Sequence, residues 1–129
     1  MKRLTTDLAD YEFDNQILLV VPKAGIVLEK SEMETMLKEA ITFTNSEKYY
    51  ALIDTSNYVE TTVEARNYYA ASEYTKYRFA DAFIVKSLPI KIVVNFYMKF
   101  NSPTLPTKMF NNRTDAMNWL MELRKSSKN

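Results

Sequence analysis

Hydrophobic residues recur along the chain at two spacings, one typical of β-strands and the other typical of α-helices. Short runs of apolar and β-branched residues predict strands at Leu8–Phe13, Ile17–Val21, Tyr49–Asp54, Ala80–Val85 and Thr107–Phe110. The first of these runs alternates only weakly and is expected at a sheet edge. The run at Ala80–Val85 is apolar at almost every position, which is typical of a central strand covered on both faces.

A turn at Pro22–Gly25 predicts a hairpin. Gly25 can adopt the positive φ that a hairpin loop needs. We therefore expect Ile26–Glu29 to return beside Ile17–Val21 as its paired strand, so that three strands precede the first helix. Strands and helices alternate after that point, which favours parallel strands joined by right-handed crossovers.

Four helices are predicted from apolar residues that recur three and four positions apart. The first begins at Ser31, because Ser31 and Glu34 have the spacing of a capping box, and it is expected to end near Asn45 and Ser46. Its buried stripe consists of Met33, Met36, Leu37, Ala40 and Ile41. The second covers Glu64–Arg78, with a break near Ala71–Ser72 and with Thr61 or Thr62 as its cap.

The last two helices have clear boundary signals. The third is expected at Pro89–Phe100, beginning at Ser87 or Leu88 with Pro89 in its first turn. The fourth has Asn112 as its cap and Asp115 three positions later. It is expected to pack Ala116, Trp119, Leu120 and Leu123 onto the sheet, with residues 125–129 as a frayed tail. Together these elements predict a single α/β domain over residues 1–129, with one mixed β-sheet and about four helices.

The third helix is apolar around most of its circumference. On a helical wheel, Lys91, Asn95 and Lys99 share one narrow polar arc, and the apolar remainder is more than twice the roughly 100° that a helix needs to pack on a sheet. The surplus is expected to meet a second subunit, a ligand or a lipid surface. The candidate interface or apolar-ligand surface consists of Ile92, Phe96, Tyr97 and Phe100.

Three absences narrow the chemistry. The chain has no His, no Cys and a single Gly. This excludes thiol catalysis, the Ser-His-Asp arrangement, the usual zinc sites and a glycine-rich phosphate loop. We expect no cofactor, no metal and no enzymatic activity. If the chain were an enzyme, Asp54 and Arg66 would be its candidate residues, although Arg66 is also expected simply to pair with Asp54 or Glu64.

The charge is balanced, with 17 basic and 16 acidic residues and a formal net charge of +1. Nucleic-acid binding normally requires a concentrated basic patch, so we expect no nucleic-acid partner. No apolar run approaches the roughly 20 residues that span a bilayer, and the amino terminus lacks the pattern of a signal peptide. We therefore expect a cytoplasmic protein that is not transmembrane.

Polar residues follow the strand at Tyr49–Asp54. Ligands of open α/β sheets bind beyond the carboxyl ends of strands, and helix amino termini attract anions. This rim is therefore a candidate ligand or phosphate site, formed by Asp54, Thr55, Ser56, Thr61, Thr62 and Arg66.

The chain also resembles a known family in its element order and in several local motifs. These motifs are Tyr50–Asp54, Glu64–Arg66, Asn95–Pro103, Pro106–Phe110 and Ala116 with Trp119 and Leu120. It is similar to the SpoIIAA-like, or STAS/SEC14-like, domains of small bacterial proteins, often from Bacteroidetes and mostly of unknown function. The resemblance implies a STAS-like fold.

Two functional expectations follow from that resemblance. Anti-sigma-factor antagonists of this fold bind a kinase and are phosphorylated on a Ser in an Asp-Ser-Ser-Gly motif. This chain has Val59-Glu60-Thr61-Thr62 in that place, where Thr61 or Thr62 would accept the phosphate. The SEC14 part of the name implies apolar ligands.

Two hypotheses for function result. The first is a non-enzymatic binding or regulatory module that acts through protein–protein contacts, as a homodimer or with an unidentified protein partner. The alternative is a carrier of a small apolar or lipid ligand, or a domain associated with a membrane surface, where Lys91 and Lys99 flank the apolar surface of the third helix.

Overall fold

The main sheet has six strands, and its arrangement is mixed. The computed structural model describes residues 1–57, 59–71 and 73–127. The strand order is β1-β2-β3-β5-β7-β8, where the two pairings among β1, β2 and β3 are antiparallel and the remaining three are parallel. The strands are β1 (Lys2–Thr5), β2 (Ala9–Asp14), β3 (Ile17–Pro22), β5 (Tyr49–Asp54), β7 (Arg78–Ile84) and β8 (Thr107–Phe110). The predicted α/β class with a mixed sheet is confirmed.

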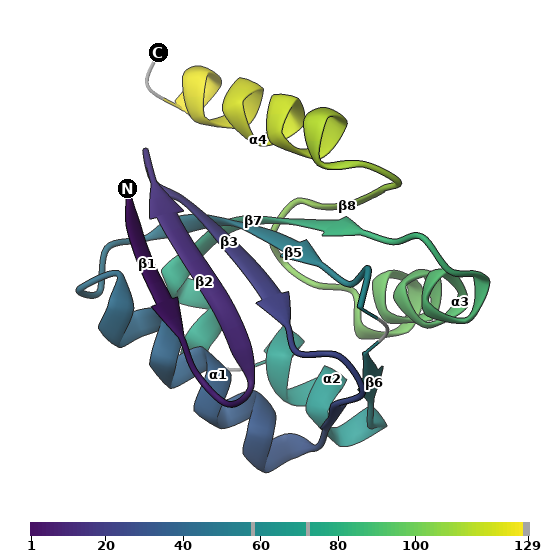
Figure 1. Ribbon diagram of the computed structural model, residues 1–129. Helices are drawn as coiled ribbons and strands as arrows, with labels where there is room; N and C mark the ends of the chain where they lie inside the picture. The colour runs from purple at the N-terminus through teal and green to yellow at the C-terminus, as the bar shows by residue number, and fades with distance from the viewer. Residues whose placement is uncertain (58, 72, 128–129) are drawn as a thin grey trace.

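Helices cover both faces of this sheet (Figure 1). One face carries α1 (Lys30–Phe43) and α2 (Val63–Ala71), and the other carries α4 (Arg113–Ser127). The third helix, α3 (Leu88–Phe96), lies at the end of the sheet and continues into a π-helical turn, η2 (Tyr97–Asn101). A 3₁₀ segment, η1 (Glu73–Tyr77), leads into β7.

Strand alternation divides the apolar residues between two cores. Along β5, Tyr49, Ala51 and Ile53 pack toward α1 and α2. Tyr50 and Leu52 point to the opposite face and pack against α4. The two faces of one strand therefore lie in different chemical surroundings, and this separation decides where the functional groups lie.

Several predicted boundaries are confirmed. The strands β5 and β8 cover the predicted residues. Ser87 caps α3 by accepting a hydrogen bond from the Ile90 amide, and the Asn112 side chain accepts one from the Asp115 amide at 2.8 Å. Thr62 caps α2, because its hydroxyl accepts a hydrogen bond from the Ala65 amide.

The predicted hairpin is wrong. Gly25 has the expected positive φ of 74°, but the chain does not return beside β3, because β2 and β5 already occupy both edges of that strand. Instead β4 (Val27–Leu28) pairs in parallel with β6 (Glu60–Thr61) in a separate two-stranded sheet. The strand predicted at Leu8–Phe13 is not an edge strand either, since β1 covers it.

The first two helices also differ from prediction. Helix α1 begins at Lys30 with Glu29 as its N-cap, and the Glu32 side chain accepts a hydrogen bond from the Glu29 amide. The predicted Ser31 cap is therefore displaced by a box two residues earlier, and Glu34 pairs with Lys38 instead.

The segment predicted as a helix to Arg78, with a break near Ala71–Ser72, is divided at that place into α2 and the 3₁₀ segment η1. Helix α2 ends at Ala71, while Ser72, part of the predicted break, lies outside the described residues. Arg78 is the first residue of β7 and is buried there. At the other end of the chain, α4 continues to Ser127, so the predicted tail from Lys125 is helical over most of its length.

Candidate functional site

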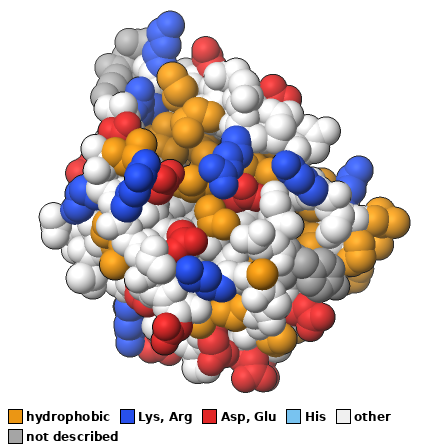
Figure 2. Space-filling model, viewed as in Figure 1, with side chains coloured by type: hydrophobic (Ala, Val, Ile, Leu, Met, Phe, Trp, Pro, Cys, Tyr) orange, Lys and Arg blue, Asp and Glu red, His pale blue; other side chains and the backbone are white. Residues whose placement is uncertain are grey.

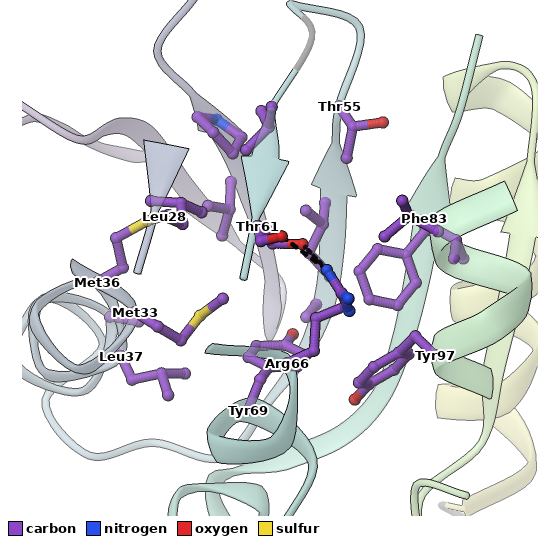
Figure 3. Close-up of a pocket in the computed structure, with 18 of the residues that line it drawn as sticks. Leu28, Met33, Met36, Leu37, Thr55, Thr61, Arg66, Tyr69, Phe83 and Tyr97 are labelled. Atoms are coloured by element: carbon purple, nitrogen blue, oxygen red, sulfur yellow. Dashed lines mark hydrogen bonds between the residues drawn. The ribbon is translucent and has the colours of Figure 1, made fainter. Parts of the chain in front are cut away.

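A cavity of about 130 Å³ lies between the sheet and helices α1, α2 and α3. Figure 3 shows side chains from these elements surrounding it, with Met33, Met36 and Leu37 on one side and Phe83 and Tyr97 on the other. Its floor is the face of β5 that carries Tyr49, Ala51 and Ile53. The short sheet of β4 and β6 borders it through Leu28 and Thr61. The lining is overwhelmingly apolar.

Small side chains in the cavity wall leave room for the cavity. Ala51 on β5 and Ala40 on α1 both line the cavity and are both buried. A larger residue at either position would project into the space. On the opposite face of the sheet, Ala80 and Ala82 are buried against α4, and no residue of α4 lines the cavity. The sequence places small residues on both faces, but the cavity lies on one.

Three aromatic rings form one end of the cavity. The ring centroids of Tyr69 and Tyr97 are 6.1 Å apart, those of Phe83 and Tyr97 5.9 Å, and those of Tyr69 and Phe83 6.4 Å. These are distances at which aromatic pairs attract each other. Tyr97 is only 4% exposed, and its hydroxyl has no hydrogen-bond partner among the described residues. Burial raises the pKa of this hydroxyl well above its usual value, so it is a neutral group.

Arg66 is the one charged residue among the described residues that line the cavity. Its Nη1 donates hydrogen bonds of 2.7 Å to both the carbonyl and the hydroxyl oxygen of Thr61. Figure 3 shows the Arg66 side chain extending from α2 toward Thr61. Arg66 makes no ion pair with any described residue, so the expected pairing with Asp54 or Glu64 is wrong.

A buried ion pair, Arg78 with Asp81, contacts Tyr69. Arg78 donates from Nε and Nη2 to the two carboxylate oxygens of Asp81, at 2.9 and 3.2 Å, and the Tyr69 hydroxyl donates to Asp81 at 3.1 Å. The Arg78 guanidinium lies 3.9 Å from the Tyr69 ring centroid. Complete burial raises the pKa of Asp81, and the hydrogen bonds from Arg78 oppose that rise.

Sequence reasoning missed this pair for two reasons. Arg78 was predicted to end the second helix, whereas it begins β7. In addition, residues three apart on a regular strand point to opposite faces. Here Tyr49 pairs with Arg78 but Tyr50 pairs with Ala80, so Phe79 is an extra residue in a β-bulge. The bulge returns Arg78 and Asp81 to the same face. The available signal was chemical: two opposite charges within an apolar strand must be paired if the strand is central.

The predicted polar rim is divided by the sheet. Asp54 points to the α4 side, where Arg113 donates to it at 2.8 Å and the Ser56 amide donates at 2.9 Å. Burial alone would raise the pKa of Asp54, but these hydrogen bonds hold it below the usual value. Thr55 lines the cavity, and its hydroxyl donates to the Ile84 carbonyl.

The remaining members of the rim lie on the cavity side or cap α2. Thr61 and Arg66 line the cavity together, and the Thr62 hydroxyl is engaged as the helix cap. Three of the predicted rim residues, Thr55, Thr61 and Arg66, are therefore brought together, while Asp54 is separated from them.

The predicted apolar surface of the third helix is also divided. Tyr97 is buried at the cavity, whereas Ile92, Phe96 and Phe100 are 56%, 59% and 61% exposed. With Leu88, which is 68% exposed, they form a row at four-residue spacing that we call the α3 ridge. The rings of Phe96 and Phe100 lie 4.4 Å apart. In Figure 2, hydrophobic side chains gather at the right edge, where Figure 1 places α3.

The described residues provide no cluster of three or more acidic side chains able to hold a metal ion. They also include no helix with the length and apolar character required to cross a bilayer.

Comparison with solved structures defines the class of fold. The chain is similar to an uncharacterised protein of the DUF3478 family from Shewanella loihica PV-4, which has a SpoIIAA-like fold. The two chains share 18% identity with a TM-score of 0.59, over 91% of this chain and 98% of the other. The protein therefore has a SpoIIAA-like fold, as the sequence resemblance implied.

The family follows from the sequence itself. Residues 11–124 match the model of a domain of unknown function, DUF7793, and the chain belongs to that family. Among curated proteins, none matches the chain.

Proposed function

We propose that this chain is a non-enzymatic binding module that holds a small apolar molecule in the cavity between its sheet and helices α1, α2 and α3. The observation that carries the proposal is the cavity of about 130 Å³ with its apolar lining. Protein cores rarely contain voids much larger than a water molecule. An apolar cavity of roughly 150 Å³ is large enough to bind benzene.

The experiment is an NMR titration of the ¹⁵N-labelled chain with toluene. We expect amide shifts at cavity residues such as Met36, Ala51 and Val94, and unchanged amides around Leu120 on the opposite face of the sheet. The variant Ala51→Ile, which fills the cavity, is expected to lose the response. Toluene that produces no saturable shifts, or shifts spread evenly over both faces, would refute the proposal.

A second candidate function is association with an anionic membrane surface through the α3 ridge. Residues 82–114 contain Lys86, Lys91, Lys99, Lys108 and Arg113 but no Asp or Glu. An exposed apolar helix face bordered by lysines is the pattern of helices that lie in the headgroup region of anionic bilayers. A second copy of this chain would bring the same positive charges to the ridge, so charge complementarity favours the lipid surface over a homodimer.

Co-sedimentation with vesicles tests this candidate. We expect binding to vesicles that contain phosphatidylserine, weaker binding to phosphatidylcholine alone, and loss of binding in Phe96→Ser. Met121→Ser, which removes an exposed apolar residue on α4, is the matched control and should bind normally. A chain that ignores the vesicles but forms a dimer that Phe96→Ser disrupts would replace this candidate with the homodimer.

A further inference from the structure

We infer that the ligand of the cavity is a small monocarboxylate with a compact apolar body, whose carboxylate is bound by Arg66. This inference rests on the proposed function, because it names the chemical class of the molecule that the cavity holds. It starts from the contrast between an apolar cavity and Arg66, the one cationic side chain in the described part of its lining.

The hydrogen bonds of Arg66 leave the Nε–Nη2 edge of its guanidinium without a partner among the described residues. Both of its described hydrogen bonds come from Nη1 and go to Thr61, a neutral residue. The N–H groups of Nε and Nη2 donate to no described residue. These two atoms form the edge that holds a carboxylate through two parallel hydrogen bonds. Thr61 therefore fixes the orientation of the guanidinium without consuming its carboxylate-binding edge.

Another arginine of the same chain shows the completed arrangement. Arg78 uses Nε and Nη2 to hold the two oxygens of Asp81 at 2.9 and 3.2 Å. Arg113 likewise uses Nε, to hold Asp54. Arg66 lines the cavity and leaves the same Nε–Nη2 edge without a hydrogen-bond partner, because the chain supplies no carboxylate to it within the described residues. The missing partner is an anion that comes with the ligand.

The rest of the ligand follows from the lining. A cation beside an apolar cavity has lost part of its hydration, and a paired anion compensates that loss. The space of about 130 Å³ limits the apolar part to about the size of one aromatic ring. The rings of Tyr69, Phe83 and Tyr97 at one end suit an aromatic body. Benzoate is the simplest molecule with both features.

The experiment compares benzoate with benzyl alcohol, which has the same ring without the charge. NMR titrations of the wild-type chain are expected to show at least tenfold tighter binding of benzoate. In Arg66→Gln, benzoate should lose that advantage, whereas benzyl alcohol should bind as before and thereby show that the cavity is intact. Arg66→Lys, which keeps the charge but not the two-pronged edge, should retain only part of the preference. Arg113→Gln, on the opposite face of the sheet, is the control and should retain all of it.

The outcomes separate the two ideas. Equal affinity for benzoate and benzyl alcohol in the wild-type chain would overturn the inference and leave the proposed function standing. The same conclusion would follow if Arg66→Gln kept the benzoate preference. If neither compound bound, and toluene did not bind either, the proposed function would fail and the inference would fail with it.

Discussion

Filling the cavity should stabilise the protein, whereas the same substitution on the other face of the sheet should destabilise it. Ala51 lines the cavity and Ala82 lies on the neighbouring strand β7, packed against α4. Both alanines are buried, at 1% and 0% exposure. The pair Ala51→Ile and Ala82→Ile therefore adds the same three carbon atoms to two central strands of one sheet, with space available at only one of them.

The expected magnitudes follow from burial. Each buried methylene contributes about 0.8 kcal/mol, so three give an upper limit of about 2.4 kcal/mol for Ala51→Ile. We expect a net gain of about 1 kcal/mol after imperfect packing is allowed for. Overpacking a filled core costs about 1–3 kcal/mol, and this is the loss expected for Ala82→Ile.

Urea unfolding, followed by circular dichroism, measures both free energies of unfolding. The difference between the two variants should be about 2–4 kcal/mol, with m-values that are unchanged. A loss of similar size in both variants would show that the space beside Ala51 is already filled in solution. That result would contradict the cavity and the ligand-binding proposal together.

Three further predictions concern other parts of the molecule. Phe96→Glu should keep the free energy of unfolding to within about 0.5 kcal/mol, because Phe96 is mostly exposed. Thermal unfolding measures the change, and a large loss of stability would show that Phe96 is covered. Asp81→Asn should lower the free energy of unfolding by about 3–5 kcal/mol, because it leaves the Arg78 charge buried without its counter-charge. Chemical denaturation measures this loss, and a loss below about 1 kcal/mol would contradict the buried ion pair. Arg113→Gln should lower the free energy of unfolding at neutral pH, and this loss should shrink as the pH falls through the lowered pKa of Asp54, because the Asp54 carboxylate stabilises the fold only while it is ionised. Acid unfolding of both proteins measures the loss. A loss that does not change with pH would show that Arg113 acts through something other than Asp54.

Local signals predicted much of the fold correctly. The strand at Tyr49–Asp54 and the caps at Ser87 and Asn112 depend on residues close together in the sequence, and each agrees with the structure. The pairing of Val27–Leu28 with Glu60–Thr61 joins two very short strands that are distant in sequence. Neither strand has enough residues to show a pattern, so its partner could not be predicted.

The candidate site was predicted in part. Proximity at a strand end placed Asp54, Thr55 and Arg66 in one rim, but alternation along the chain sends Asp54 to the opposite face. The apolar arc on the third helix is wider than one contact covers, and the structure buries Tyr97 while it leaves Phe96 exposed. That the exposed part meets a partner stays a prediction. The cavity depends on how side chains from both sheets and from helices α1, α2 and α3 pack together, and no local sequence pattern predicts the space between them.

Helix α3 contributes to two surfaces at once. Ile90 and Val94 border the cavity, whereas Ile92 and Phe96 belong to the α3 ridge on the other side of the same helix. If each surface has its own binding partner, any shift of α3 that favours one partner changes the affinity for the other. Such a coupling is reciprocal: the factor by which an occupied cavity alters affinity at the ridge equals the factor by which an occupied ridge alters affinity in the cavity. Binding of a small molecule in the cavity would then control binding of a partner at the α3 ridge, and the reverse.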